Sequence, residues 1–143
     1  MEVTLQNQLS AIPPVHEALD RFAAQHNLSR AFVSSLHVAL EEHLANIIKH
    51  GYTGTSLGTI RVRFQTDSTC ITIVISDNGK PFNPLDKPDV NVSLPLNRKP
   101  LGGLGLLMIR RSVDEAQYEY LNGDNRLTLT KRVARPASPG VER

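Results

Sequence analysis

Two adjacent stretches between residues 59 and 76 restrict the possible folds more than any other feature of the sequence. Residues 59–66 (TIRVRFQT) alternate between apolar and polar side chains, which is typical of a strand with one buried face. Residues 69–76 (TCITIVIS) are apolar enough to form a central strand. The turn residues Asp67 and Ser68 separate the two, so we expect a hairpin. A sheet with one apolar face needs a second layer to cover it.

Two amphipathic segments precede this hairpin and are expected to supply the second layer. Pro13 and Pro14 stand where a helix can start, and apolar residues follow at helical spacing up to Asn27. Ser29 is a good N-cap for the next helix, and Gly51 is a good C-cap. The apolar positions of that second helix are Phe32, Val33, Leu36, Leu40, Leu44, Ile47 and Ile48.

The remaining segments complete the fold prediction. Residues 2–8 alternate as a first strand, residues 106–116 have helical spacing, and residues 117–133 form a hairpin around Asn122-Gly123-Asp124. The expected order is strand, helix, helix, strand, strand, loop, helix, strand, strand. Most strands are linked by hairpins, so the fold class is α+β. We expect a two-layer α/β sandwich whose mixed, mostly antiparallel sheet is covered on one face by three helices.

Composition and length fit one soluble domain. The chain has 143 residues, 40% of them hydrophobic, which is enough for one core. Residues 1–133 are expected to form that domain, and residues 134–143 a flexible polar tail. The net charge of +2 gives no case for nucleic acid or a membrane as a direct partner.

The single cysteine, Cys70, excludes an intrachain disulfide and is expected to be a small core residue. The chain starts without an apolar leader and has no apolar run of the roughly 20 residues that would span a bilayer. These features predict a cytoplasmic protein.

The first candidate site lies on the second helix, where Glu42, Asn46, Lys49 and His50 occur within about three turns. These four side chains fall beside the apolar face, whereas Glu41 points to the polar side. An Asn oxygen suits Mg²⁺, a Glu can take a proton from a hydroxyl, and a Lys can neutralise phosphate. A solvated helix flank with ordinary i,i+4 contacts explains the same residues.

The second candidate site is SDNGKPFNP, residues 76–84. Asp77 continues the parity of the apolar strand residues Ile73 and Ile75, so its carboxylate is expected to point inward, where it needs hydrogen-bond donors. It could accept a hydrogen bond from the exocyclic amine of a purine. Gly79 would let a ligand approach the backbone. A simple Asp-Asn-Gly turn after a strand is the alternative.

The third candidate site is the glycine run LGGLGLLMI, residues 101–109, which leads into a helix. Free backbone N–H groups at a helix N-terminus can bind an anion. The spacing matches neither the P-loop nor the G-x-G-x-x-G pattern. A hinge for the preceding loop is the alternative. That loop, within residues 77–103, holds five of the nine prolines and has no clear periodicity.

Taken in order, the three motifs resemble those of the GHKL ATPases, the superfamily of gyrase-type, MutL-type and histidine-kinase ATP-binding domains. The shared order is E-x-x-x-N on a helix, D-x-G-x-P-F after a strand, a long loop, and G-G-x-G opening a helix. The resemblance spans residues 29–133. Within the superfamily, the run NIIKHGY and the block GGLGLLMIRRSVDE look most like the RsbW-like anti-sigma-factor serine/threonine kinases.

The resemblance implies a role for each matching residue. Asn46 would ligate the Mg²⁺ that bridges the phosphates of ATP, and Glu42 would be the catalytic general base. Asp77 would accept a hydrogen bond from the adenine amine, and residues 83–101 would form the ATP lid. The other residues expected to bind ATP are Lys49, His50, Gly79, Phe82, Arg98, Lys99, Gly102, Gly103, Leu104 and Gly105.

The resemblance also implies an activity. The chain would be an ATP-dependent serine/threonine kinase that phosphorylates an anti-anti-sigma (STAS-type) protein, sequesters a sigma factor and forms a homodimer. One departure affects phosphotransfer more than nucleotide binding: Leu101 stands where the kinases often have a basic residue, and Arg98 and Lys99 come earlier. Two alternatives stay open, a nucleotide-binding regulatory module without kinase activity and a detached histidine-kinase-type ATPase domain.

Overall fold

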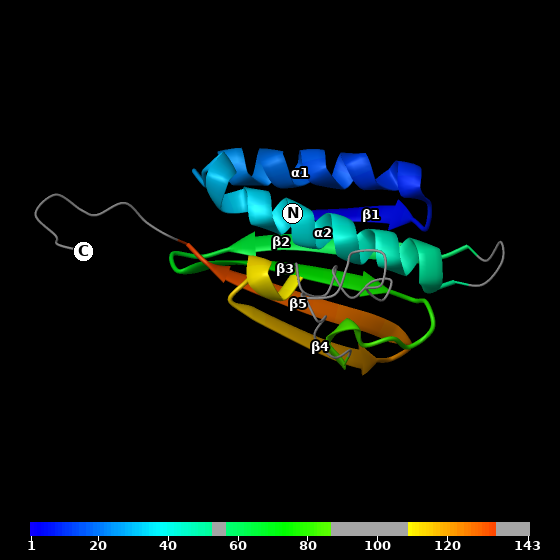
Figure 1. Cartoon of the computed structure of the whole chain (residues 1–143). Helices are drawn as coiled ribbons and strands as arrows, with labels where there is room; N and C mark the ends of the chain where they lie inside the picture. The colour runs from blue at the N-terminus through cyan, green and yellow to red at the C-terminus, as the bar shows by residue number, and fades with distance from the viewer. Residues whose placement is uncertain (53–56, 87–108, 134–143) are drawn as a thin grey trace, which may run out of the picture.

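The computed structural model describes residues 1–52, 57–86 and 109–133 of the chain. These residues form two layers, with the helices α1 and α2 lying across one face of a five-stranded sheet (Figure 1). The expected α+β sandwich is therefore confirmed.

The sheet has the strand order β1-β2-β3-β5-β4. Each of the four described pairings is antiparallel, so the described sheet contains none of the parallel pairs that a mixed sheet would have. The hairpins β2–β3 and β4–β5 were expected, and β5 inserts between β3 and β4. The strands are β1 (Glu2–Gln6), β2 (Thr59–Thr66), β3 (Cys70–Asp77), β4 (Glu115–Leu121) and β5 (Asp124–Arg132).

The two long helices begin and end close to where the sequence predicted. Helix α1 spans Ile12–Gln25 and helix α2 spans Arg30–His50. The Ser29 side chain accepts a hydrogen bond from the N–H of Phe32 at 3.0 Å, which confirms the N-cap. Gly51 ends α2, and its N–H bonds the carbonyl one turn earlier at 2.7 Å. No helix in the described ranges is long and apolar enough to cross a membrane.

Three shorter helical pieces complete the described secondary structure: η1 (Leu9–Ala11), η2 (Pro84–Asp86) and residues 109–112. The helix predicted over residues 106–116 extends too far at its C-terminal end. In the structure the helix ends at residue 112 and β4 begins at Glu115. The hydrogen bonds of β4 to β5 replace the helical ones there.

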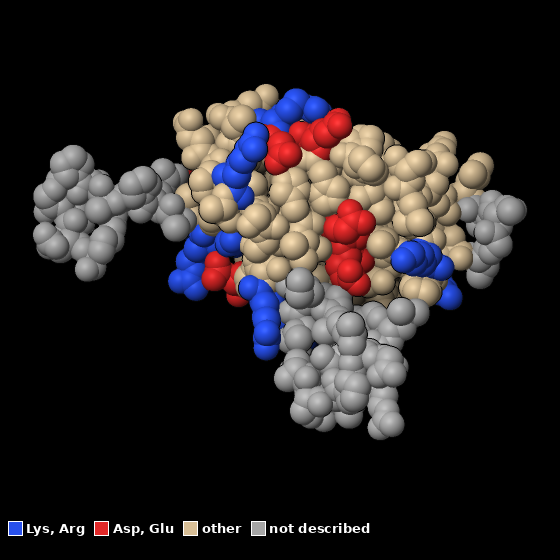
Figure 2. Space-filling model, turned by 45° about the horizontal axis from the view of Figure 1, so that its top comes forward, with Lys and Arg blue, Asp and Glu red and all other residues tan. Residues whose placement is uncertain are grey.

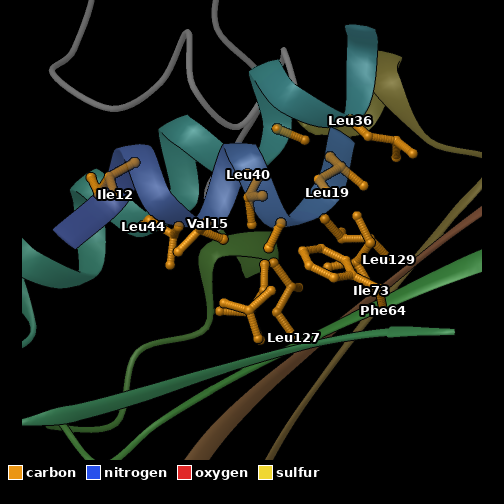
Figure 3. Packing of buried hydrophobic residues seen from close by; sticks show 14 of the residues in the cluster. Ile12, Val15, Leu19, Leu36, Leu40, Leu44, Phe64, Ile73, Leu127 and Leu129 are labelled. Atoms are coloured by element: carbon orange, nitrogen blue, oxygen red, sulfur yellow. The ribbon is translucent and has the colours of Figure 1, made fainter. Parts of the chain in front are cut away.

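The core lies between the helices and the face of the sheet that they cover (Figure 3). Leu19 and Leu40 from the helices pack with Phe64 from the sheet, and all three side chains are fully buried. Cys70 was expected in this core but is only half-buried. It precedes the buried Ile71 in β3, so the strand alternation points the thiol to the other face.

The β4–β5 turn sets the register that the candidate site depends on. Asn122 and Gly123 both have positive φ, 54° and 83°, as a tight two-residue hairpin turn requires. The resulting register places Asn125 opposite Tyr120 on one side and opposite Asp77 on the other. The register therefore brings together the ends of β3 and β4 and the start of β5. The segment after β3 contacts the end of α2 there, and the polar residues of the site collect at this place.

Candidate functional site

A cavity of about 270 Å³ opens between the C-terminal half of α2 and the adjacent end of the sheet. Most of its wall is apolar and a few polar groups converge on it, as in small-molecule sites. Its residues come from α2 and its C-cap, from the end of β3 and the segment after it, and from β4 and β5. They are His43, Asn46, Ile47, His50, Gly51, Asp77, Lys80, Pro81, Phe82, Tyr118, Asn125 and Leu127.

A buried carboxylate lies at the sheet end of the cavity. Asp77 is only 4% exposed, as its parity in β3 predicted. Its Oδ2 accepts hydrogen bonds from the N–H of Gly79 at 2.9 Å and from Nδ2 of Asn125 at 3.2 Å. Within the described residues, its Oδ1 has no hydrogen-bond partner and is left for a donor on a ligand. Burial raises the pKa of Asp77, against the opposing effect of its two donors.

Asn125 connects this carboxylate to the rest of the wall. Its Nδ2 donates to the carbonyl of Lys80 at 2.9 Å and approaches the carbonyl of Gly79 at 3.4 Å. Its Oδ1 accepts from the N–H of Phe82 at 3.0 Å and from the hydroxyl of Tyr118. The amide thus fixes the segment after β3 against β4 and β5.

The same segment also touches the end of α2. The N–H of Lys80 donates to the carbonyl of Gly51 at 3.0 Å, and a Cβ on Gly79 would lie 2.5 Å from that oxygen. Nearby, the Tyr52 hydroxyl donates a hydrogen bond to Oδ1 of Asn78 at 2.8 Å. Burial raises the pKa of Tyr52 to about 12, so this hydroxyl keeps its proton at neutral pH. Gly79 was expected to make room for a ligand. In the structure, the absence of a Cβ at Gly79 makes room for the backbone at the end of α2, and the ligand role stays a prediction.

His43 is a residue of the cavity that the sequence prediction missed. It is 4% exposed, and within the described residues its Nδ1 is buried without a hydrogen-bond partner. Burial lowers the pKa of His43 to about 4, so the imidazole is neutral at pH 7. A histidine at the apolar spacing of Leu36, Leu40 and Ile47 was the available signal.

The structure brings together part of the predicted set. Asn46, His50, Asp77 and Phe82 line the cavity, and Gly79 bonds Asp77 beside it.

Two predicted residues of α2 do not line the cavity. Glu42 is half-buried one turn before Asn46, and Lys49 is exposed near the end of the helix. The residues that lie outside the described ranges are Arg98, Lys99, Gly102, Gly103, Leu104 and Gly105, together with residues 87–101 of the expected lid.

Asn125 and Tyr118 were also missed, although strand parity pointed to them. Asn125 precedes Leu127 and Leu129 at alternate positions of β5, so its side chain lies on the buried face of the sheet. Tyr118 has the parity of the inward-facing Ala116 in β4. A polar side chain at a buried strand position was the signal that identified Asp77, and it applies equally to Asn125.

The polar groups present suit a nucleotide better than a dedicated metal centre. An accepting carboxylate oxygen in the wall of an apolar cavity fits an exocyclic amine of a base. The amide oxygen of Asn46 is a hard donor of the kind that Mg²⁺ takes. In the described ranges no group of three or more His, Cys, Asp or Glu could hold a metal ion. Magnesium would therefore need phosphate oxygens and water besides Asn46.

Comparison with known proteins agrees with this chemistry. The family model described as histidine kinase-like ATPase domain matches residues 5–131. The serine/threonine-protein kinase BtrW of Bordetella bronchiseptica is 26% identical over 116 residues, covering 81% of this chain and 82% of the relative. The serine-protein kinase RsbW of Listeria monocytogenes is 27% identical over 122 residues, covering 81% of this chain and 76% of the relative.

The fold is also found among solved structures. The crystal structure of the RsbU and RsbW domains of Rv1364c from Mycobacterium tuberculosis superposes on 96% of this chain with a TM-score of 0.66. The sequences are 21% identical, and this chain covers 33% of that longer chain.

Proposed function

Because the chain belongs to the histidine kinase-like ATPase domain family, we propose that it binds ATP with Mg²⁺ in this cavity and phosphorylates a serine or threonine of a partner protein. One observation carries the proposal most directly. Among the described residues, a buried carboxylate in the wall of an apolar cavity, Asp77, is held by Gly79 and Asn125 through one oxygen only. Such a group binds a ligand that brings an N–H donor to the other oxygen.

The base of the nucleotide would occupy the sheet end of the cavity. Oδ1 of Asp77 would accept a hydrogen bond from the exocyclic amine of adenine. The flat faces of the ring would pack on apolar cavity residues, Ile47 from α2, Leu127 from β5 and the half-exposed Phe82. A base with a carbonyl in place of the amine would set an acceptor against the carboxylate, so this arrangement favours adenine over guanine.

The phosphates would lie along α2. Asn46 would hold Mg²⁺ through its amide oxygen, and bound Mg²⁺ would offset the negative charge of the phosphate oxygens. Glu42 precedes Asn46 by four residues, about 6 Å along the helix. Its carboxylate would accept the proton of the attacking hydroxyl, and Lys49 at the exposed end of α2 would add positive charge.

The identity of the partner rests on the relatives and on the resemblance of the motifs. Two relatives are named as serine or serine/threonine kinases, which supports a hydroxyl acceptor. The resemblance to the RsbW-like kinases supports an anti-anti-sigma protein of the STAS type as substrate and a sigma factor as second partner, bound by a homodimer. A phosphate adds a charge of about −2 to the substrate surface and can release it from the kinase.

A nucleotide-binding module without phosphotransfer is the second candidate. One observation favours it: Glu42 is half-buried and does not line the cavity. In that case the chain would hold ATP and bind its partner, and hydroxyl attack would not be promoted.

The substitution Glu42→Gln separates the two candidates. The full chain is incubated with labelled ATP, Mg²⁺ and a STAS-type protein, and acid-stable phosphoserine or phosphothreonine is measured. A general base contributes about 10²–10⁴-fold, so Glu42→Gln should lower the phosphorylation rate by at least about 100-fold while ATP affinity stays the same.

The matched control is Glu17→Gln, an exposed glutamate on α1, which should phosphorylate at the wild-type rate. Equal rates in the wild type and Glu42→Gln would exclude the general-base role. ATP binding without phosphate transfer to any STAS-type protein tested would favour the binding module.

A further inference from the structure

A second polar cluster lies between α1 and α2, outside the residues that line the cavity. His16 from α1 and His37 from α2 face each other, with their Nδ1 atoms 2.7 Å apart and their ring centroids 4.9 Å apart. Nε2 of His16 lies 2.8 Å from Oε1 of Glu41, and Nε2 of His37 lies 2.8 Å from Oδ1 of Asp20. Figure 2 brings the α1 side of the molecule forward and shows acidic side chains in small groups on a mostly uncharged surface.

The hydrogen-bond partners of the two histidines show which ring nitrogens carry a hydrogen. Carboxylate oxygens only accept hydrogen bonds, so each Nε2 must carry a hydrogen. A neutral imidazole has one hydrogen, so the Nδ1 of a neutral His16 and the Nδ1 of a neutral His37 would both present lone pairs. Two lone pairs at 2.7 Å repel each other unless a cation lies between them. The cluster is therefore arranged to share one cation, either a proton at the observed hydrogen-bond distance or a metal ion if the two rings separate slightly.

We propose that His16 and His37 form a binding site for a divalent transition-metal ion such as Zn²⁺, held through both Nδ1 atoms between the two helices. Imidazole nitrogen is a preferred ligand of zinc. Histidines that bind metal commonly donate the other ring N–H to a carboxylate, which is the contact that Glu41 and Asp20 make here. Neither residue belongs to the nucleotide cavity.

The required change in geometry is small. Zinc–nitrogen bonds of about 2.0–2.1 Å at a tetrahedral angle place two nitrogens about 3.3 Å apart. The Nδ1 atoms, at 2.7 Å, would have to separate by about half an ångström, which a small rotation of either side chain provides.

The site is open to ions from solvent. The two histidine side chains are 23% and 24% exposed, and the carboxylates beside them are more exposed. Glu41 and Asp20 contact the far nitrogens, so the described residues supply two ligands and water completes the coordination. The ion would be bound more weakly than in a closed site with four protein ligands, and it would link α1 to α2.

Calorimetric titration of the metal-free full chain with ZnCl₂ tests the proposal. The wild type should bind one Zn²⁺ per chain, and Zn²⁺ should raise its melting temperature. His16→Gln and His37→Gln should each weaken this binding at least about tenfold and remove the thermal shift. His26→Gln, which changes an exposed histidine at the end of α1, should bind Zn²⁺ as the wild type does.

A second variant tests the carboxylates. Glu41→Gln keeps both metal ligands but weakens the acceptor for Nε2 of His16, so Zn²⁺ affinity should fall by about tenfold. Absence of Zn²⁺ binding, or binding that His16→Gln and His37→Gln leave unchanged, would overturn the proposal. A melting temperature that depends on pH through the two histidines but not on Zn²⁺ would also overturn it, and would assign the shared cation as a proton.

Discussion

Asp77 shows at the scale of one residue how a binding group can oppose folding. Burial raises the pKa of this carboxyl above the value of 3.8 for the free group. Between these two pKa values the folded state binds more protons than the unfolded state, so stability falls as pH rises through that interval. At neutral pH the ionised side chain therefore destabilises the fold, and a bound amine donor would offset part of that effect.

Replacing Asp77 with asparagine should separate stability from binding. The new amide oxygen can accept the hydrogen bonds of Gly79 and Asn125, and no charge is buried, so the free energy of unfolding at pH 7 should be equal or higher. The new amide nitrogen would face the adenine amine donor to donor. ATP affinity should fall by about 1–3 kcal/mol, roughly 5- to 150-fold. Urea unfolding and calorimetry measure the two effects, and unchanged ATP affinity would contradict the base assignment.

His43 should produce acid sensitivity. Its pKa is lowered from 6.5 to about 4 by burial, so its contribution to stability is complete above pH 6.5 and is lost as pH falls toward 4. The loss amounts to about 3 kcal/mol over that interval. His43→Leu should remove this part of the pH dependence, as measured by urea unfolding between pH 4 and 7. The exposed His26→Gln variant should keep it, and an identical pH profile for His43→Leu would refute the assignment.

At the scale of elements, the position of the cavity depends on the contact between the end of α2 and the segment after β3. A Cβ on Gly79 would lie 2.5 Å from the carbonyl of Gly51. Gly79→Ala should push the two elements apart, lower the free energy of unfolding by about 1–3 kcal/mol and weaken ATP binding. Thermal unfolding and calorimetry check both effects.

Gly123→Asn is the matched control for that prediction. Gly123 lies in the β4–β5 turn, where a Cβ would have no heavy atom within 4 Å, so the cost of the substitution comes from the φ of 83° alone; asparagine is among the residues that adopt a positive φ most readily. This variant should lower the free energy of unfolding through backbone strain at that φ but leave ATP affinity unchanged, because the turn does not line the cavity. Wild-type behaviour of Gly79→Ala would show that the contact does not position the cavity.

Most helices and strands could be predicted because residues close together in the sequence determine where they begin and end. Ser29 caps α2 through its own side chain, and the positive φ angles of the Asn122-Gly123 turn follow from residue type. The predicted end of the third helix was wrong because a contact between residues distant in sequence determines it. Residues 115–116 have helical spacing, but pairing of β4 with β5 decides their conformation, and helical spacing alone contains no information on that pairing.

At the scale of the whole molecule, the fold joins three segments that are distant in sequence. Asn46 lies on α2, Asp77 ends β3 and Asn125 is the second residue of β5, and all three line one cavity. Asn46 and Asp77 could be predicted, because each stands out on its own element. The contact of Asn125 with Asp77 could not be predicted, because it depends on the insertion of β5 beside β3.

Calorimetric titration of the full chain with ATP shows directly whether the cavity is a nucleotide site. Calorimetric titration with and without Mg²⁺ should show one ATP per chain, bound more tightly with Mg²⁺. Asn46→Ala should remove the effect of Mg²⁺ and lower the affinity at least about tenfold. Asn27→Gly, a change at an exposed residue with a φ of 57° that glycine tolerates, should bind as the wild type does. If the wild-type protein does not bind ATP, the cavity is not a nucleotide site. If Asn46→Ala binds ATP with unchanged affinity and Mg²⁺ dependence, Asn46 does not hold the metal ion.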